Sequence, residues 1–198
     1  MSGSVETIIP RWEWRTFGAT FGDADRRFGE SAAGRIQESD ELYLLSPKSD
    51  ANVKIRDRLM DIKALERVNA DGLEQWRPVM KSEFPLPAAA VEQVCAALQV
   101  TPPLARERYT LDELQTELTH PSRGVRAVHV RKKRQRCTVG GCLAEMTEVL
   151  ADGHAIRTIA IEFEDAALVR AAVLEMGLGQ FENISYPRGL KRLLGMAA

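Results

Sequence analysis

The chain has 198 residues, of which 44% are hydrophobic and 28% charged, so it can bury a core as one domain or as two small ones. Its formal charge of −1 argues against a protein that coats nucleic acid through its whole surface, so any site for a polyanion must be local. No repeat or flexible linker divides the sequence, and we expect a single domain over residues 1–198.

The N-terminus lacks a basic segment followed by an apolar one, and no later stretch is apolar over the length of a bilayer. We therefore expect a soluble, cytoplasmic protein with no membrane partner. Cys95, Cys137 and Cys142 are too few for a disulfide framework and lack zinc spacing, so we interpret them as reduced thiols. A cross-strand pair of Cys137 and Cys142 stays open as an alternative.

Eight segments alternate in side-chain character with the period of two that is typical of strands. In chain order they are residues 11–17, 40–45, 53–59, 61–67, 76–84, 125–137, 142–150 and 155–164. Turn residues separate many of them, at 46–50, 69–72, 140–141 and 151–153.

Three helices are predicted between and after these strands. Residues 87–98 are rich in alanine, a capping box begins at Thr110, and the helical spacing of 165–176 stops at Gly177. Strands grouped before and after helices, without regular βαβ alternation, indicate an α+β fold with an antiparallel sheet.

Several strands have an apolar side and an ionic side. One predicted strand carries Lys54, Arg56 and Arg58 on the same face. In the run VHVRKKRQR, one face carries Val128, Val130, Lys132 and Arg134, and the opposite face carries His129, Arg131, Lys133 and Gln135. A solvated outer face accounts for each strand taken singly. The sorting by sign argues against that interpretation, because like charges directly opposite each other on neighbouring strands are destabilising. If the sheet closes into a barrel, the ionic sides line a tunnel in which cations hold phosphates and carboxylates bind Mg²⁺ or Mn²⁺.

At these residues the chain resembles the CYTH family, also called triphosphate tunnel metalloenzymes, over nearly its whole length. The family's first-strand motif Glu-x-Glu-x-Lys is matched by Arg11-Trp12-Glu13-Trp14-Arg15, its alternating basic strands by Lys54, Arg56 and Lys63, its Lys-x-Arg strand by Arg131-Lys132-Lys133, and its later Glu-x-Glu by Glu162-Phe163-Glu164. Ser185-Tyr186, followed by an apolar and basic segment, is similar to the end of the family pattern.

The resemblance implies an eight-stranded antiparallel β-barrel that forms a tunnel with flanking helices, and metal-dependent hydrolysis of an inorganic or organic triphosphate. The roles it implies are metal binding by Glu13, Glu145, Glu162 and Glu164, phosphate binding by Arg15, Lys54, Arg56, Lys63, Arg131 and Lys133, and catalysis by Glu162, Glu164 and Lys63. The implied cofactor is Mg²⁺ or Mn²⁺, and the implied partner is a small-molecule triphosphate or polyphosphate. A homodimer stays open.

Two residues depart from the family pattern. Arg11 stands in the place of the first glutamate and Arg15 in the place of the lysine, so a positive charge lies where a metal needs an anion. A noncatalytic binder of polyphosphate or nucleotide with a degenerate metal site is therefore the second hypothesis. The third, nucleic-acid binding through residues 128–136, is disfavoured because this run alternates like a strand and lacks interleaved aromatic residues.

Overall fold

The computed structural model describes residues 9–30, 36–102 and 106–196. Its strands are β1 (Arg11–Gly18), β2 (Gln37–Leu45), β3 (Asn52–Arg56), β4 (Leu59–Val68), β5 (Glu74–Glu83), β6 (Leu86–Pro87), β7 (Arg108–Tyr109), β8 (Arg126–Val139), β9 (Cys142–Ala151) and β10 (His154–Phe163). Its α-helices are α1 (Asp23–Glu30), α2 (Ala88–Leu98), α3 (Leu111–Leu118), α4 (Ala166–Glu175) and α5 (Tyr186–Leu193), with a 3₁₀ turn at Pro121–Arg123.

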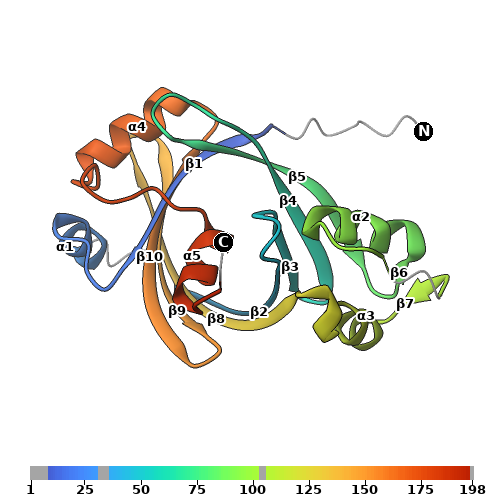
Figure 1. Ribbon diagram of the computed structural model, residues 1–198. Helices are drawn as coiled ribbons and strands as arrows, with labels where there is room; N and C mark the ends of the chain where they lie inside the picture. The colour runs from blue at the N-terminus through green and yellow to red at the C-terminus, as the bar shows by residue number, and fades with distance from the viewer. Residues whose placement is uncertain (1–8, 31–35, 103–105, 197–198) are drawn as a thin grey trace, which may run out of the picture.

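Eight of these strands form a closed antiparallel barrel in the order β1-β10-β9-β8-β2-β3-β4-β5, and β5 pairs with β1 to close the ring (Figure 1). The short strands β6 and β7 pair with each other outside the barrel. The eight-stranded barrel with flanking helices that the sequence predicts is therefore confirmed. Closure matters for function because it turns one face of every strand toward a shared interior.

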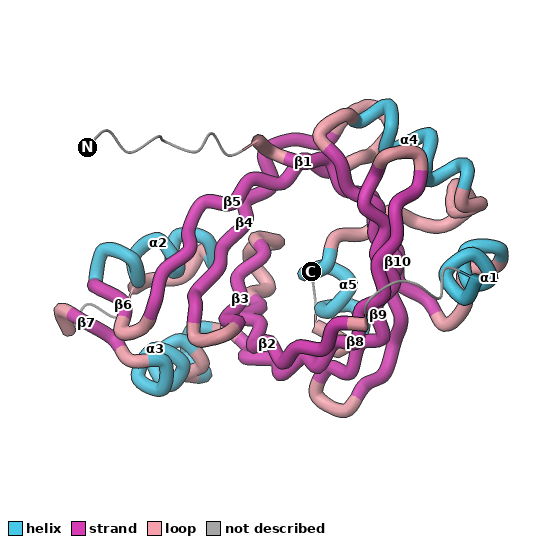
Figure 2. The backbone as a smooth tube through the Cα atoms, turned by 180° about the vertical axis from the view of Figure 1, so that it is seen from behind, coloured by secondary structure: helices cyan, strands magenta, loops and turns pink. Residues whose placement is uncertain are grey.

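Helices cover the outside of the barrel on two sides. On one side, Trp14 of β1 belongs to a buried apolar cluster with Val169 of α4. On the other, Ile62 of β4 is buried with Val94 of α2. Figures 1 and 2 show α4 beside β1 and β10, and α2 beside β4 and β5, from opposite sides of the molecule. The outer apolar faces of the strands are thus buried beneath helices, which leaves their other faces to line the interior.

The helix α5 lies within the ring of strands in both views. Tyr186 and Leu190 of α5 form a buried cluster with Tyr43, Leu45 and Val130 from the inner face of the barrel. One part of the barrel interior is therefore an ordinary apolar core. A second part, described below, is ionic.

The packing of α5 depends on Gly189. A Cβ atom at this position would overlap the ring of Phe17 on β1, so the helix approaches the barrel wall as closely as its backbone allows. The ring of Phe17 also meets that of Tyr186 edge to face, with the ring centroids 5.4 Å apart. These contacts fix the first turn of α5 against the wall.

The structure confirms the helices predicted over 87–98 and 165–176, and the capping box of Thr110 and Glu113 begins α3. The strand predicted over 53–59 is present as β3, but its predicted end is wrong. It ends at Arg56, because Asp57 and Arg58 have φ angles of 53° and 62° and form a tight hairpin turn into β4. Among the residues that the structure describes, none of the helices combines the length and apolar character needed to cross a membrane.

Candidate functional site

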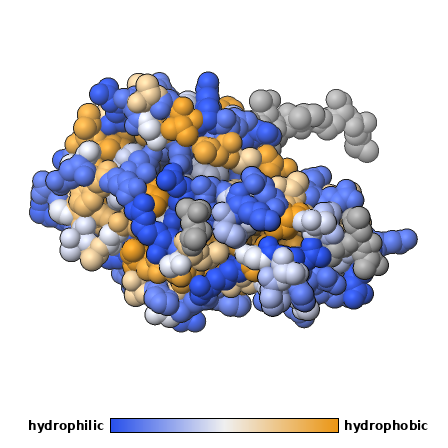
Figure 3. Space-filling model, viewed as in Figure 1, coloured by the Kyte–Doolittle hydropathy of each residue, from blue (hydrophilic) through white to orange (hydrophobic). Residues whose placement is uncertain are grey.

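The ionic part of the barrel interior contains a cavity of about 190 Å³. Every strand of the ring except β5 contributes to its lining, and along each strand these inward positions alternate with outward ones. Its charged lining consists of the cations Arg15, Lys54, Arg56, Lys63, Lys132, Arg134 and Arg136 and the carboxylates Glu13, Asp61, Glu145 and Glu162. Cations outnumber carboxylates, so the cavity favours an anionic ligand. Figure 3 shows hydrophilic residues around the middle of the face from which Figure 1 views the barrel.

Glu41 of β2 holds several of these cations in place. The side chain of Glu41 is fully buried, and its carboxylate accepts a hydrogen bond from Arg134. The same carboxylate lies 2.9 Å from Lys132 Nζ, 3.5 Å from Lys54 Nζ and 3.9 Å from Arg56 Nη1. Burial alone would raise the pKa of Glu41, but the charges of Lys132, Lys54 and Arg134 outweigh burial and hold the pKa well below its usual range. Because β2 lies between β3 and β8, one carboxylate can bind cations from both neighbours.

Lys132 is buried between aromatic side chains. Its Nζ donates to Tyr43 Oη at 2.6 Å and lies 3.9 Å from the ring centroid of Tyr186, while Tyr43 Oη in turn donates to Glu41 at 3.1 Å. Burial lowers the pKa of Lys132, and the nearby Glu41 charge opposes this effect. Burial likewise lowers the pKa of Lys54. An additional anion in the cavity would therefore stabilise the charged forms of both lysines.

Glu145 of β9 lies on another side of the cavity. Its carboxylate accepts hydrogen bonds from Arg136 Nε at 2.8 Å and from Thr147 Oγ1 at 3.0 Å, and Arg134 Nε lies 3.7 Å away. Burial would raise the pKa of Glu145, but the charges of Arg15, Arg134 and Arg136 outweigh it and lower the pKa. Glu145 is therefore ionised and orients arginines that face the cavity.

Glu13 and Glu162 are directly opposite each other on the paired strands β1 and β10. Arg15 Nε donates to Glu13 Oε1 at 2.8 Å, and Arg11 Nη1 donates to Glu162 Oε1 at 3.1 Å. On the other side of β1, Glu74 of β5 is directly opposite Glu13, and burial raises its pKa. Three carboxyl groups thus lie on adjacent strands, and those of Glu13 and Glu162 are each bound by an arginine.

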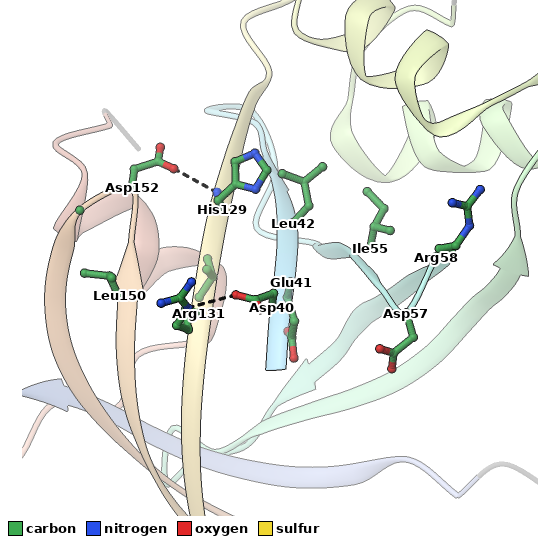
Figure 4. Close-up of a pocket in the computed structure, with 12 residues that line it drawn as sticks. Asp40, Glu41, Leu42, Ile55, Asp57, Arg58, His129, Arg131, Leu150 and Asp152 are labelled. Carbon is green, nitrogen blue, oxygen red and sulfur yellow. Dashed lines mark hydrogen bonds and ion pairs between the residues drawn. The ribbon is translucent and has the colours of Figure 1, made fainter. Parts of the chain in front are cut away.

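The structure brings seven of the predicted site residues to the cavity, namely Glu13, Arg15, Lys54, Arg56, Lys63, Glu145 and Glu162. Arg131 and Lys133 lie elsewhere. The side chain of Arg131 is 69% exposed on the outer wall and pairs with Asp40 at 3.3 Å (Figure 4), and Lys133 lies 3.9 Å from Glu148. Glu164 follows the last residue of β10 and is exposed, outside the lining of the cavity. The metal-binding and catalytic roles of these residues stay predictions.

The expected placement of Arg131 and Lys133 inside the tunnel is corrected by the alternation of β8. The inward face of this strand runs from Val128 and Val130 through Lys132 and Arg134, because it passes from the apolar core around α5 to the ionic cavity. The resemblance in sequence instead implied phosphate binding by Arg131 and Lys133, which lie on the opposite face of the strand. An error of one position in a strand turns every side chain to the opposite face.

Lys132, Arg134, Arg136 and Glu41 are thus site residues that the sequence did not single out. For the cations, the alternation of β8 already grouped Lys132 with Arg134, and that grouping was a usable signal. For Glu41, an acidic residue preceding the apolar residues 42–45 of a strand was the only local hint.

The carboxylates of the cavity, as arranged, do not fit a resident divalent cation. Among the described residues, no group of three or more His, Cys, Asp or Glu side chains is placed to hold a metal ion. Glu13, Glu145 and Glu162 each accept a hydrogen bond from an arginine side chain instead. Mg²⁺ and Mn²⁺ prefer several oxygen ligands that are free to coordinate them.

Comparison with known proteins supports the architecture. No family model matches the chain, and no curated protein matches its sequence. A putative adenylate cyclase from Bacillus halodurans has a TM-score of 0.51 with 9% identity, over 90% of this chain and 94% of that one. The PH1012 protein of Pyrococcus horikoshii has a TM-score of 0.51 with 18% identity, over 89% of this chain and 97% of that one. The fold is a closed barrel with an ionic interior. It is the fold of CYTH, or triphosphate tunnel, domains, as the resemblance in sequence predicts.

Proposed function

We propose that this protein binds the triphosphate group of a small molecule in the ionic cavity of the barrel. The observation that carries the proposal is the array of lysines and arginines from β1, β3, β4 and β8 that faces one cavity and is oriented by buried carboxylates. Holding several cations together without a ligand is unfavourable, and a chain of phosphates neutralises them. Arginine forks match phosphate oxygens in pairs, and lysines supply point charges.

The size of the cavity supports a compact ligand. At about 190 Å³ it is smaller than the roughly 300–1,000 Å³ of a typical pocket for a whole organic ligand. A triphosphate group fits this description, whether it is inorganic or attached to an organic group that stays at the mouth of the tunnel. Nucleic-acid binding has less support, because Arg131 and Lys133 on the outer wall are paired with acidic residues.

Hydrolysis of the same triphosphate is a second candidate function, and it corresponds to the metal-dependent activity implied by the resemblance in sequence. What favours it is that carboxylates line the same cavity as the cations. Carboxylates can orient a water molecule toward a phosphoryl group. Three of the four carboxylates that line the cavity, those of Glu13, Glu145 and Glu162, are bound by arginines, so this arrangement does not favour a step through a divalent cation.

Isothermal titration calorimetry with tripolyphosphate tests the binding proposal. Arg136 and Lys133 are a matched pair, because their side chains are 43% and 47% exposed but only Arg136 lines the cavity. Arg136→Ala is expected to weaken binding about tenfold or more, the effect of losing one hydrogen bond to a charged group, whereas Lys133→Ala should change Kd by less than about twofold. Affinity should also fall with added salt. Absence of binding by wild type, or an equal loss in both variants, contradicts the proposal.

Phosphate release separates the two candidate functions. Wild type and Glu162→Gln would be incubated with inorganic triphosphate, thiamine triphosphate or ATP, in the presence of Mg²⁺ or Mn²⁺. Turnover by wild type that is lost in Glu162→Gln supports hydrolysis. Binding without turnover supports the noncatalytic alternative.

A further inference from the structure

Arg11, the first residue of β1, lies at a mouth of the ionic cavity. Its side chain is 54% exposed, and it lines a cavity of about 260 Å³ together with Lys63 and Trp76. This outer cavity shares Glu13, Lys63 and Glu162 with the interior one, so the two are adjacent. A ligand that enters the ionic cavity from this side passes Arg11.

The carboxylates at this mouth are the ones that the sequence resemblance assigns to a metal. Glu13 and Glu162 are directly opposite each other across β1 and β10. Both accept a hydrogen bond from a guanidinium group, with Arg15 at 2.8 Å and Arg11 at 3.1 Å. Arginine stays protonated in proteins, so these positive charges are permanent.

A divalent cation between these carboxylates would be repelled by both guanidinium groups and would have to displace them. A phosphate oxygen that contacts Arg11 and Lys63, two cations that line the same cavity, would instead be attracted by both. The arginine thus supplies at this mouth the positive charge that a metal ion would otherwise bring.

We infer that triphosphate binds in this tunnel without a divalent cation, and that the guanidinium of Arg11 contacts the phosphate chain at the mouth in place of a metal. The inference rests on the proposed function, since it concerns the same ligand in the same cavity. It goes beyond that function by assigning the positive charge that neutralises the phosphates to side chains of the protein alone, without a metal ion.

The experiment is calorimetric titration of tripolyphosphate in EDTA and, separately, in Mg²⁺. The Kd in EDTA is expected to equal the Kd in Mg²⁺ within about twofold, or to be lower, because Mg²⁺ neutralises the ligand's charge. Binding that requires Mg²⁺ overturns the inference and leaves the proposed function standing. Absence of binding in both solutions overturns the proposed function itself, and the inference with it.

Arg11→Glu is the decisive variant, and Arg170→Glu is its matched control. Arg170 is an arginine of α4 that is 62% exposed, pairs with Asp71 at 3.2 Å and lines neither the interior cavity nor the outer one. In EDTA, Arg11→Glu should weaken tripolyphosphate binding at least about tenfold, and Mg²⁺ should restore part of the loss, whereas Arg170→Glu should match wild type.

Binding of Mn²⁺ alone, measured by electron paramagnetic resonance of the free ion, gives a readout that does not involve phosphate. Wild type is expected to show no tight site. Arg11→Glu should gain one, because it frees Glu162 and adds a carboxylate beside it. Tight Mn²⁺ binding by wild type, or an unchanged Kd for tripolyphosphate in Arg11→Glu, contradicts the inference.

Discussion

Replacing Glu41 by glutamine removes the negative charge that lies among Lys132, Lys54, Arg134 and Arg56, while the shape of the side chain is kept. The variant leaves Lys132, whose side chain is 5% exposed, without the carboxylate that neutralises it, and leaves Arg134, also 5% exposed, with Glu145 as its one remaining carboxylate among the described residues. With so small an exposed fraction, water solvates these charges less well than the carboxylate does. The folded state should therefore lose stability.

The expected cost follows from burial. Removing one partner of a buried ion pair costs about 3–5 kcal/mol, because the remaining charge stays desolvated. In a chain of this length each kcal/mol lowers Tm by about 2–4 °C, so a fall of roughly 10 °C is expected. Asp40→Asn is the control: Asp40 is the preceding residue, 82% exposed on the outer wall, and its pair with Arg131 should contribute at most about 1 kcal/mol.

For both variants, urea unfolding gives the free energy of unfolding and thermal unfolding gives Tm, each followed by circular dichroism. Saturating tripolyphosphate should raise Tm more in Glu41→Gln than in wild type, because the ligand supplies the anion that the variant lacks. A loss below about 1 kcal/mol for Glu41→Gln, or the same loss for Asp40→Asn, would refute the role of Glu41 as the charge that holds the cations together.

Two further predictions concern the pH dependence of triphosphate binding and the packing of α5 against β1. Burial lowers the pKa of Lys54, and a bound triphosphate is expected to raise that pKa again. The affinity for triphosphate is therefore greatest below the lowered pKa of Lys54 and falls as the pH rises through it. In titrations of tripolyphosphate between about pH 7 and pH 10, Lys54→Arg should lose less affinity than wild type as the pH rises, because arginine stays protonated. The ligand's own ionisation affects both proteins equally. An equal fall in affinity with pH in the two proteins would contradict this prediction. Gly189→Ala should cost about 1–3 kcal/mol in urea unfolding because its Cβ would overlap Phe17, whereas Gly29→Ala, with no atom within 4 Å of the added Cβ, should be neutral or slightly stabilising; similar effects would refute the close packing of α5.

Local signals predicted those elements whose cause is local. The capping box at Thr110 and Glu113 places the start of α3, and the alternation of residues 125–137 and 142–150 identifies β8 and β9. The helix α5 was not predicted, because Gly189 lies inside its short length, although Ser185 and Pro187 stand at its N-terminus where they favour the start of a helix. It forms where its tyrosine and leucine side chains fill the apolar part of the barrel, which is a tertiary effect.

The candidate site was predictable to the extent that it depends on strand position alone. Glu13, Arg15, Lys54 and Glu162 could be chosen from their motifs, and they do line the cavity. Arg131 could not be placed correctly. Period-two alternation separates a strand into two faces, and it does not state which face is inside when one of them is part apolar and part ionic.

The sequence by itself determined a set of antiparallel strands in which cations and carboxylates recur at the spacing of strands, and its resemblance to a known family implied that these strands close into a barrel. Only the tertiary structure decided which charges meet. Glu41 binds Lys132, 91 residues away in the chain, because closure of the sheet makes β2 and β8 neighbours. The physical reason is that backbone periodicity is a property of consecutive residues, whereas the neutralisation of a buried charge depends on groups that folding brings together from distant strands.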